Sequence, residues 1–182
     1  MDETPARIEV RLRELAQLFN SMDPSPFHER DLDADAEEFI VSWAREHATH
    51  RELELLIHLA EVPPADRGPG TGDAVRHYFL ARAELKHREF RRLMRQGRFS
   101  LGVGLAFLVC CLALGALTGG IVAAHGHPTA ADILKESLTI GGWVAMWRPL
   151  EIYLYEWWPL RDEWRLLERL ARMRVTLLLP AA

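Results

Sequence analysis

One uninterrupted apolar stretch dominates the pattern of hydrophobic and polar positions along this chain. Residues Leu101–Ala124 form 24 consecutive positions without a charged side chain. At ~1.5 Å per residue, a helix of this length reaches roughly 36 Å, which exceeds the hydrocarbon core of a bilayer at about 30 Å. The stretch therefore predicts a transmembrane helix and not the buried helix of a soluble protein.

A second apolar stretch, Leu138–Leu160, follows a polar connector at 125–137. Three charged side chains interrupt it, and Trp157 and Trp158 near its end are typical of an aromatic belt at the headgroup level. We expect this stretch to cross the membrane as a second helix. The alternative is an interfacial re-entrant helix broken at Pro149.

Before the first apolar stretch, the periodicity changes from one segment to the next. Thr4 is predicted to cap a helix that has one apolar face, formed by Ile8, Leu12, Leu15 and Phe19. A helix opened by Asp33 or Asp35 is predicted to turn inward the side chains of Ala36, Phe39, Ile40 and Trp43. Alternation within Leu53–Leu59 predicts a strand, and Val75–Ser100 predicts a long helix that runs into the apolar stretch.

After the second apolar stretch, Trp164, Leu167 and Leu170 predict a short helix, and the β-prone Val175–Leu179 is expected to pair with Leu53–Leu59. Two strands are marginal alone, so they must pack on helices or on a second copy. The predicted fold class is a mainly α membrane protein. It combines a transmembrane helical hairpin with a small α+β domain of two or three helices and a two-stranded sheet.

Charge divides the chain further than hydropathy does, although the 182 residues carry a net charge of only −4. Residues 1–74 hold 7 basic and 17 acidic side chains, whereas 75–100 hold 8 basic and 2 acidic ones. We therefore expect an acidic head joined to a basic neck. The predicted segments are the acidic head at 1–72, the neck helix at 73–100, the first span at 101–124, the external connector at 125–137, the second span at 138–160 and a C-terminal helix and strand at 161–182.

The basic side chains beside the two spans predict the orientation. Five arginines precede the first span: Arg88, Arg91, Arg92, Arg95 and Arg98. Five more follow the second span, whereas the connector has only Lys135. By the positive-inside rule, both termini lie in the cytoplasm and the protein is a multi-pass protein of the inner membrane. The neck is expected to meet anionic headgroups and not nucleic acid; docking of the acidic head onto it is the alternative.

The cysteines and the first residues bear on the compartment. Cys110 and Cys111 are adjacent within the apolar stretch, which argues against a disulfide-stapled secreted fold and favours a packing role. Met1–Glu14 carries four acidic side chains and lacks the basic and apolar regions of a signal peptide.

Arg148 and Glu151 are the sharpest candidate for chemistry, because they lie one helical turn apart inside the second span. Charged side chains at membrane depth are expensive unless they are paired or face a cavity. Pro149 between them frees the carbonyl of Ala145 as a further polar partner. The pair forms either an ion or proton route or a ligand pocket in an oligomer, or it is a neutralised pair that holds helices together and fixes their register.

Small residues predict close helix packing. Gly115 and Gly119 form a GxxxG motif, and Gly141 and Gly142 in the second span also permit close backbone approach. This pattern fits packing of the hairpin on itself as well as a homo-oligomer.

Metal sites are not predicted. The acidic run at 31–38 resembles a calcium loop, but Ala36 stands where Gly is needed and Ser42 where a bidentate Glu is needed, so helix capping is favoured. The His47/His50 and His125/His127 pairs have no further ligands at a recognisable spacing. No cofactor is implied.

Two stretches resemble those of small bacterial two-span membrane proteins of no assigned function. These are Ser21–Ile40, SMDPSPFHERDLDADAEEFI, and Gly141–Leu160, GGWVAMWRPLEIYLYEWWPL. The resemblance implies the topology of a two-span protein and carries no activity.

The sequence also lacks a phosphate-binding glycine loop, GxSxG, HExxH and CxxC, so an enzyme is not expected. The preferred hypothesis is a non-enzymatic membrane-anchored scaffold or regulatory subunit, whose head binds a cytoplasmic protein. The alternative hypothesis is a subunit of a small oligomeric ion or proton channel or transporter that uses Arg148 and Glu151.

Overall fold

The computed structural model describes residues 5–22, 30–47, 51–63, 70–125 and 128–180. It divides into two compact units. We call residues 1–87 with 161–182 the sheet unit, and residues 88–160 the hairpin unit. The hairpin unit is thus an insertion within the chain of the sheet unit.

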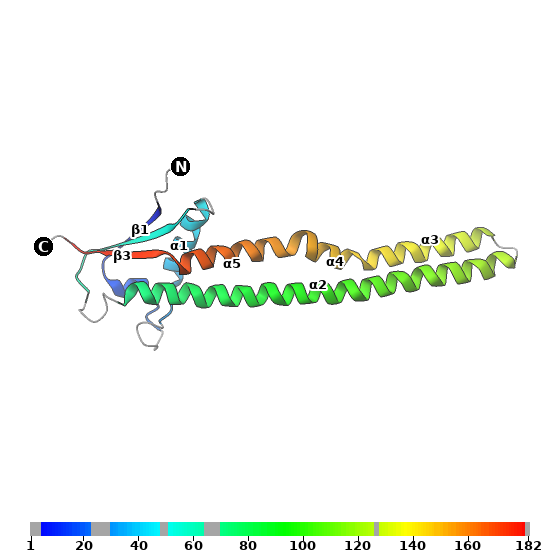
Figure 1. Ribbon diagram of the computed structural model, residues 1–182, viewed down its shortest axis with the longest axis horizontal. Coiled ribbons are helices and arrows are strands. Elements are labelled where there is room, and N and C mark those ends of the chain that lie inside the picture. The colour runs from blue at the N-terminus through cyan, green and yellow to red at the C-terminus, as the bar shows by residue number, and fades with distance from the viewer. Residues whose placement is uncertain (1–4, 23–29, 48–50, 64–69, 126–127, 181–182) are drawn as a thin grey trace. The chain divides into compact units, whose positions relative to one another are not determined.

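The sheet unit contains a three-stranded parallel sheet in the order β1 (Ala6–Leu12), β2 (Leu53–Leu59) and β3 (Arg174–Leu178). Figure 1 shows the blue β1 and the red β3 in this one sheet, although they come from opposite ends of the chain. The connection from β1 to β2 contains α1 (Ala34–Glu46), and the connection from β2 to β3 contains the whole hairpin unit. The structure is mainly helical with a small sheet, as predicted, but the predicted two-stranded sheet is wrong because the sheet has three strands, all of them parallel.

The predicted N-terminal helix is wrong, because β1 occupies its place; Thr4 lies outside the described residues. The error has a clear origin. Ile8 and Leu12 fit a helical period, but alternate positions of the same segment also fit a strand, and its burial alternates accordingly. Pairing decides between them, because β1 aligns Ile8 with Leu55 and Val10 with Ile57, so both strands bury one common face.

The predicted pairing of the two other strands is confirmed. β2 pairs with β3 so that Leu55 lies beside Val175 and Ile57 beside Leu177. Leu55 and Ile57 are fully buried, whereas Val175 and Leu177 on the edge strand are partly buried against the same core. β2 is hence the central strand and β3 one of two edges.

One hydrophobic core joins the sheet to its helices. α1 contributes Ile40 and Ala44, and the short 3₁₀ helix η1 (Leu15–Leu18) contributes both of its leucines. The start of α2 and the end of α5 complete the core with Val75, Phe79, Leu167 and Leu170. The predicted inward face of α1 is wrong in part, because Phe39 and Trp43 are about two-fifths exposed.

α2 (Thr71–Ala124) is one continuous helix of 54 residues, as the pattern from the neck into the apolar stretch predicts. Of the described helices, it is the one that is long and apolar enough to cross a membrane. Its first part belongs to the sheet unit, where Lys86 pairs with Glu163 at 3.2 Å and the His87 ring lies 4.4 Å from the Trp164 ring.

The return path is helical but interrupted. It comprises α3 (Pro128–Ala145), α4 (Trp147–Glu151), the π-helical turn η3 (Ile152–Glu156) and α5 (Trp157–Ala171). Most of the polar connector predicted at 125–137 is helical, because α3 already begins at Pro128. Proline suits the first position of a helix, since no partner is needed there for its missing N–H.

Candidate functional site

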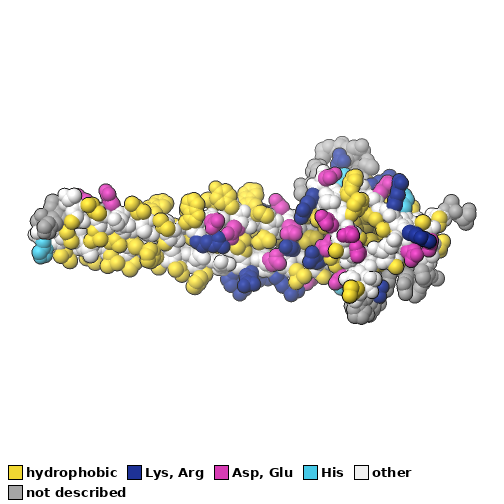
Figure 2. Space-filling view, turned by 180° about the vertical axis from the view of Figure 1, so that it is seen from behind, with side chains coloured by type: hydrophobic (Ala, Val, Ile, Leu, Met, Phe, Trp, Pro, Cys, Tyr) yellow, Lys and Arg dark blue, Asp and Glu magenta, His cyan; other side chains and the backbone are white. Residues whose placement is uncertain are grey.

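The hairpin unit packs mainly with small residues inside, Ile152 being a large exception, and with large apolar residues outside. Along α2, the positions turned toward the return path recur every seven residues as Gly97, Gly104 and Cys111, all of them buried. Gly142 is buried opposite, beside Leu108 and Cys111. Hydrophobic side chains cover most of the hairpin face visible in Figure 2. The large exposed ones include Val103, Phe107, Leu117, Ile121, Ile140, Trp143 and Trp147.

The predicted packing glycines do not behave alike. A Cβ on Gly142 would lie 2.7 Å from Leu108 Cδ1, and one on Gly115 would lie 3.6 Å from Lys135 Cα, so both glycines face the opposite helix. Gly119 is more distant, at 3.9 Å from the Ala131 carbonyl oxygen. Gly141 has nothing within 4 Å and points out of the hairpin, so it takes no part in this packing.

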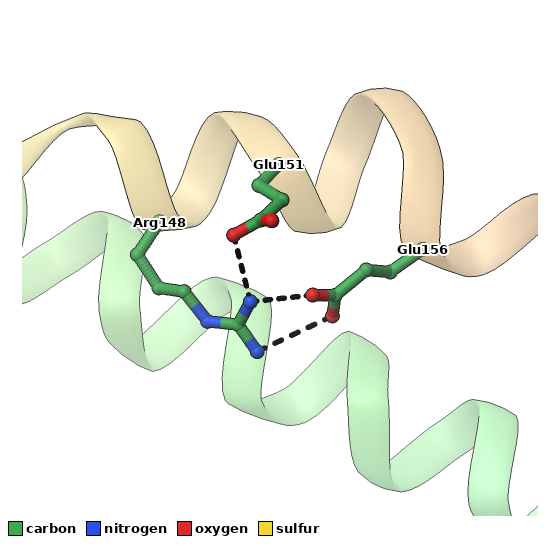
Figure 3. A network of polar contacts seen from close by, with 3 residues as sticks. All are labelled: Arg148, Glu151 and Glu156. Carbon is green, nitrogen blue, oxygen red and sulfur yellow. Dashed lines mark hydrogen bonds and ion pairs between the residues drawn. The ribbon is translucent and has the colours of Figure 1, made fainter.

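Arg148 lies between two carboxylates and not one (Figure 3). Its Nη1 donates to Glu151 Oε2 at 2.9 Å, the pair that the sequence predicts. The same guanidinium also forms an ion pair with Glu156, in which Nη2 donates to Oε2 at 3.3 Å. The Arg148–Glu151–Glu156 cluster thus holds one positive and two negative groups, each partly exposed.

The π-helical turn explains why Glu156 was not predicted as a partner. In a regular α-helix, side chains eight residues apart point roughly 80° away from each other. One extra residue in the turn η3 reduces this difference to roughly 20°, so Glu156 returns to the face of Arg148. Helical spacing alone cannot reveal such a contact, although the sequence does mark Glu156 as a charge within the second span.

The turn is accommodated by the helix opposite. Ile152 is fully buried, and a Cβ on Gly97 would lie 2.9 Å from its Cγ2 atom. Tyr153 follows at 3.3 Å from the same point, and its carbonyl accepts a hydrogen bond of 2.8 Å from Trp157 Nε1. The absence of a side chain at Gly97 therefore makes room for the π-helical turn.

The helix break beside Arg148 also follows from sequence chemistry. Pro149 has no N–H to donate to the carbonyl of Ala145, where α3 ends, and the chain turns at Met146. Helical bonding resumes with Leu150, whose N–H donates to Met146 at 3.2 Å. Gly104 of α2 lies against the Ala145 carbonyl, since a Cβ there would be 3.0 Å from its oxygen.

A shallow hollow of about 370 Å³ opens beside this break. Phe99, Val103 and Phe107 line it from α2, and Pro149 with Arg148 from α4. The lining of this hollow is mostly apolar, and Arg148 is the charged residue in it.

A second polar cluster fixes α1 to the neck part of α2 within the sheet unit. Tyr78 Oη donates to Glu37 Oε2 at 2.6 Å, and Arg82 Nε donates to Glu37 Oε1 at 3.0 Å. Burial and then the neighbouring Glu37 carboxylate raise the pKa of Tyr78. Burial lowers the pKa of Arg82, but the hydrogen bond and charge of Glu37 outweigh it and leave that pKa raised. The acidic head thus docks on the neck at this point.

The remaining predicted positions are structural or surface positions. The side chain of Asp33 caps α1 by accepting from the Asp35 N–H at 3.1 Å, which confirms the capping role. Among the described residues, no three His, Cys, Asp or Glu side chains gather as metal ligands. The neck arginines are exposed along α2: Arg88, Arg91, Arg92, Arg95 and Arg98.

Comparison with protein-family models, with curated proteins and with solved structures finds no match for this chain.

Proposed function

We propose that this protein is an integral membrane protein whose hairpin unit crosses the bilayer twice and holds the sheet unit at the cytoplasmic face. The inverted packing of the hairpin carries this proposal. A helix pair in water buries its large apolar side chains, whereas here glycine, alanine and cysteine lie inside while Val103, Leu117 and Trp143 are more than half exposed. A lipid environment removes the penalty of such an exposed apolar surface.

Strand pairing supports two crossings. β2 precedes the hairpin unit and β3 follows it, yet the two strands are hydrogen-bonded neighbours. Both must therefore lie on the same side of any membrane, and a chain that crosses once in α2 has to cross back before Arg174. This favours a full second span over the re-entrant alternative, and it brings the two termini to one side. The arginine-rich neck favours the cytoplasm as that side.

Single-cysteine labelling tests this topology. In a background without Cys110 and Cys111, a membrane-impermeant maleimide applied to intact bacterial spheroplasts should label Asp132→Cys near the hairpin tip. Glu46→Cys in the sheet unit should react only after lysis. Labelling of both positions before lysis, or of neither, would contradict two crossings with cytoplasmic termini, and the cysteine-free background controls for other thiols.

For its role, we propose a membrane-anchored scaffold or regulatory subunit, without enzymatic activity, whose sheet unit binds a cytoplasmic protein. The outward pair Phe39 and Trp43 on α1 supports this role, because two large aromatic side chains with ring centroids 6.0 Å apart are exposed on one surface. Deleting residues 1–72 would be a poor test of partner binding, because the deletion would remove both β1 and β2 from the sheet.

A photo-crosslinking residue at position 43 tests the role in intact cells. It should give a discrete cross-linked product with a second protein, whereas the same residue at exposed Arg11 on β1 should not. Equal products from both positions, or none from position 43, would remove the support for a docking surface on α1.

The charge of the Arg148–Glu151–Glu156 cluster favours a second candidate function, a subunit of an oligomeric ion or proton channel. Two carboxylates against one guanidinium leave an excess negative charge when all three are ionised. For this candidate, Glu151→Gln should change cation or proton flux in liposomes without unfolding the protein. A monomeric native mass in nanodiscs would count against it, because two helices cannot enclose a water-filled path.

A further inference from the structure

A hollow lined by arginines lies at one edge of the sheet. Because all three strands are parallel, their amino ends meet at this edge. The hollow measures about 730 Å³ and is bordered there by Pro5, the start of β2 and the start of β3. The end of α5 and the first turns of α2 contribute the remaining side chains. All of these residues belong to the sheet unit.

Positive charge is concentrated in this hollow although the whole chain is acidic. Its lining contains five arginines, namely Arg51, Arg76, Arg169, Arg172 and Arg174, against the two carboxylates Glu52 and Glu54. Like charges that converge on one space repel each other unless an opposite charge lies between them. The three-charge excess therefore marks the hollow as a place for an anion.

Some of the charged side chains in this hollow already have partners within the fold. Arg76 forms an ion pair with Asp73, and Glu54 is directed to Arg7 at 3.3 Å on the open face of the sheet. Arg169 Nη2 donates to the backbone carbonyl of Arg51 at 2.9 Å. Burial lowers the pKa of Arg169, so this guanidinium is partly removed from water.

Three guanidinium groups remain available. Among the residues that the structure describes, Arg51, Arg172 and Arg174 form no ion pair, and all three are exposed at the rim. They come from three places in the chain: the residue before β2, the turn after α5 and the first residue of β3. In the sequence, Arg172 and Arg174 count only among the basic residues that follow the second apolar stretch, whereas the fold brings them to the same hollow as Arg51.

We propose that this arginine-lined hollow binds a phosphate-bearing anion with at least two negative charges. Guanidinium groups present parallel N–H donors that match phosphate oxygens. Several guanidinium groups together can neutralise an anion with two or more charges, whereas a single carboxylate would leave most of their positive charge without a partner. The volume lies within the range of small-molecule sites, roughly 300–1,000 Å³. Either a soluble phosphate compound or the headgroup of an anionic phospholipid supplies this chemistry. The inference concerns the sheet unit alone and holds whether or not the hairpin unit crosses a membrane.

The experiment uses the full chain in phosphatidylcholine nanodiscs with inorganic pyrophosphate as the soluble probe. Calorimetric titration should detect binding, and the double variant Arg172→Gln/Arg174→Gln should bind roughly tenfold more weakly or not at all. The matched control, Arg11→Gln/Arg45→Gln, removes the same charge from exposed arginines of the sheet unit outside the hollow and should bind as the parent does. Arg51→Gln repeats the test from a different part of the chain.

A second arm identifies a lipid source. Native mass spectrometry of the protein released from nanodiscs with phosphatidylglycerol should then show retained anionic lipid that the Arg172→Gln/Arg174→Gln variant loses and the control keeps. Binding of pyrophosphate alone assigns a soluble ligand, and retention of lipid alone assigns a headgroup. The proposal is overturned if neither probe distinguishes the hollow variants from the control while circular dichroism shows all of them folded. Because detergent micelles serve equally for the first arm, failure of the topology experiment would leave this result unaffected.

Discussion

Gly141 and Gly142 are neighbours in sequence but lie in opposite environments. A Cβ on Gly142 would meet Leu108 Cδ1 at 2.7 Å and Leu108 Cα at 3.3 Å, whereas one on Gly141 would meet nothing within 4 Å. The contact on Gly142 includes backbone of α2, so it cannot be relieved by a rotamer change alone. One position therefore controls the approach of the two helices, and the other is available to lipid or to another copy.

We expect Gly142→Val to destabilise the hairpin by roughly 1–3 kcal/mol, because overpacking forces the helices apart. Gly141→Val is the matched control and should change stability by much less. Reversible unfolding in mixed micelles measures both. Equal effects at the two positions would contradict the orientation of this helix.

Arg148 shows how one side chain can depend on two partners. Glu156 accepts from both terminal nitrogens of the guanidinium, whereas Glu151 accepts from one. The bidentate partner fixes the geometry more strongly.

Glu156→Gln should lower the thermal unfolding temperature more than Glu151→Gln does, and the double variant should lower it by more than the sum of the two. The physical reason is that either carboxylate alone still neutralises Arg148, but removing both leaves its charge unpaired beside apolar surface. Thermal scans in nanodiscs provide the measurement. Additive effects of the two single changes would show that the carboxylates do not share one partner.

Helix α1 is held on α2 by a contact between one carboxylate and two donors. Glu37 accepts from Tyr78 and from Arg82, while the apolar side of α1 buries Ile40 and Ala44. The outward aromatic pair Phe39 and Trp43 is left free of this contact and open to a partner.

The raised pKa of Tyr78 makes a pH prediction for this pair of helices. A hydroxyl whose pKa is higher in the folded than in the unfolded state stabilises the fold below the unfolded value of 10.0, and this contribution disappears as pH rises above it. The free energy of unfolding of the parent should therefore fall more steeply between about pH 9 and about pH 11 than that of Tyr78→Phe. Tyr155→Phe, at an exposed position of the hairpin unit, is the control and should follow the parent. Parallel pH profiles for parent and Tyr78→Phe would refute the assignment.

Whether a segment forms a helix or a strand was predictable wherever the segment fitted only one hydrophobic period. The alternating Leu53–Leu59 and the apolar Leu101–Ala124 have a single interpretation, and both appear as predicted in β2 and α2. The segment of β1 carries two compatible periods, so its conformation depends on pairing with β2 and could not be predicted locally. The turn η3 is likewise invisible to helical spacing, because it changes the spacing itself.

For the whole molecule, the insertion of a helical hairpin within a parallel sheet is the main organisational feature. β2 and β3 are separated by more than one hundred residues, yet they form a continuous ladder. The sheet unit can therefore be completed only after the chain has returned through α3, α4 and α5.

The sheet unit should fold without the hairpin unit. Lys86 and Glu163 form an ion pair, and the His87 ring contacts the Trp164 ring in a tilted arrangement, so the two helices are neighbours where the hairpin unit is inserted. Replacing residues 88–160 by a flexible linker of about six residues should give a soluble protein, because the core of the sheet unit is complete within the remaining segments. Its circular dichroism, native mass and cooperative thermal unfolding should be those of a folded monomer. An aggregated or non-cooperative product would show that the hairpin unit is required for the core.

The residues of the candidate sites also divide into those that were predictable from the local sequence and those that only the fold brings together. Arg148 and Glu151 were predictable because three residues along a helix bring side chains together locally. Glu156 required the π-helical turn, and the arginines of the hollow required the parallel register that collects strand ends from residues 5, 54 and 174 at one edge.

The local sequence thus determined the long apolar helix, the β-prone segments, the cap of α1 and the closely spaced charge pair. Each of these features depends on neighbours within a few positions. Tertiary structure alone decided that β1 is a strand, that the sheet is parallel, that Gly142 and not Gly141 faces α2, and that distant arginines converge. Each of these depends on contacts between segments far apart in the chain, whose free energy exists only after both segments have met.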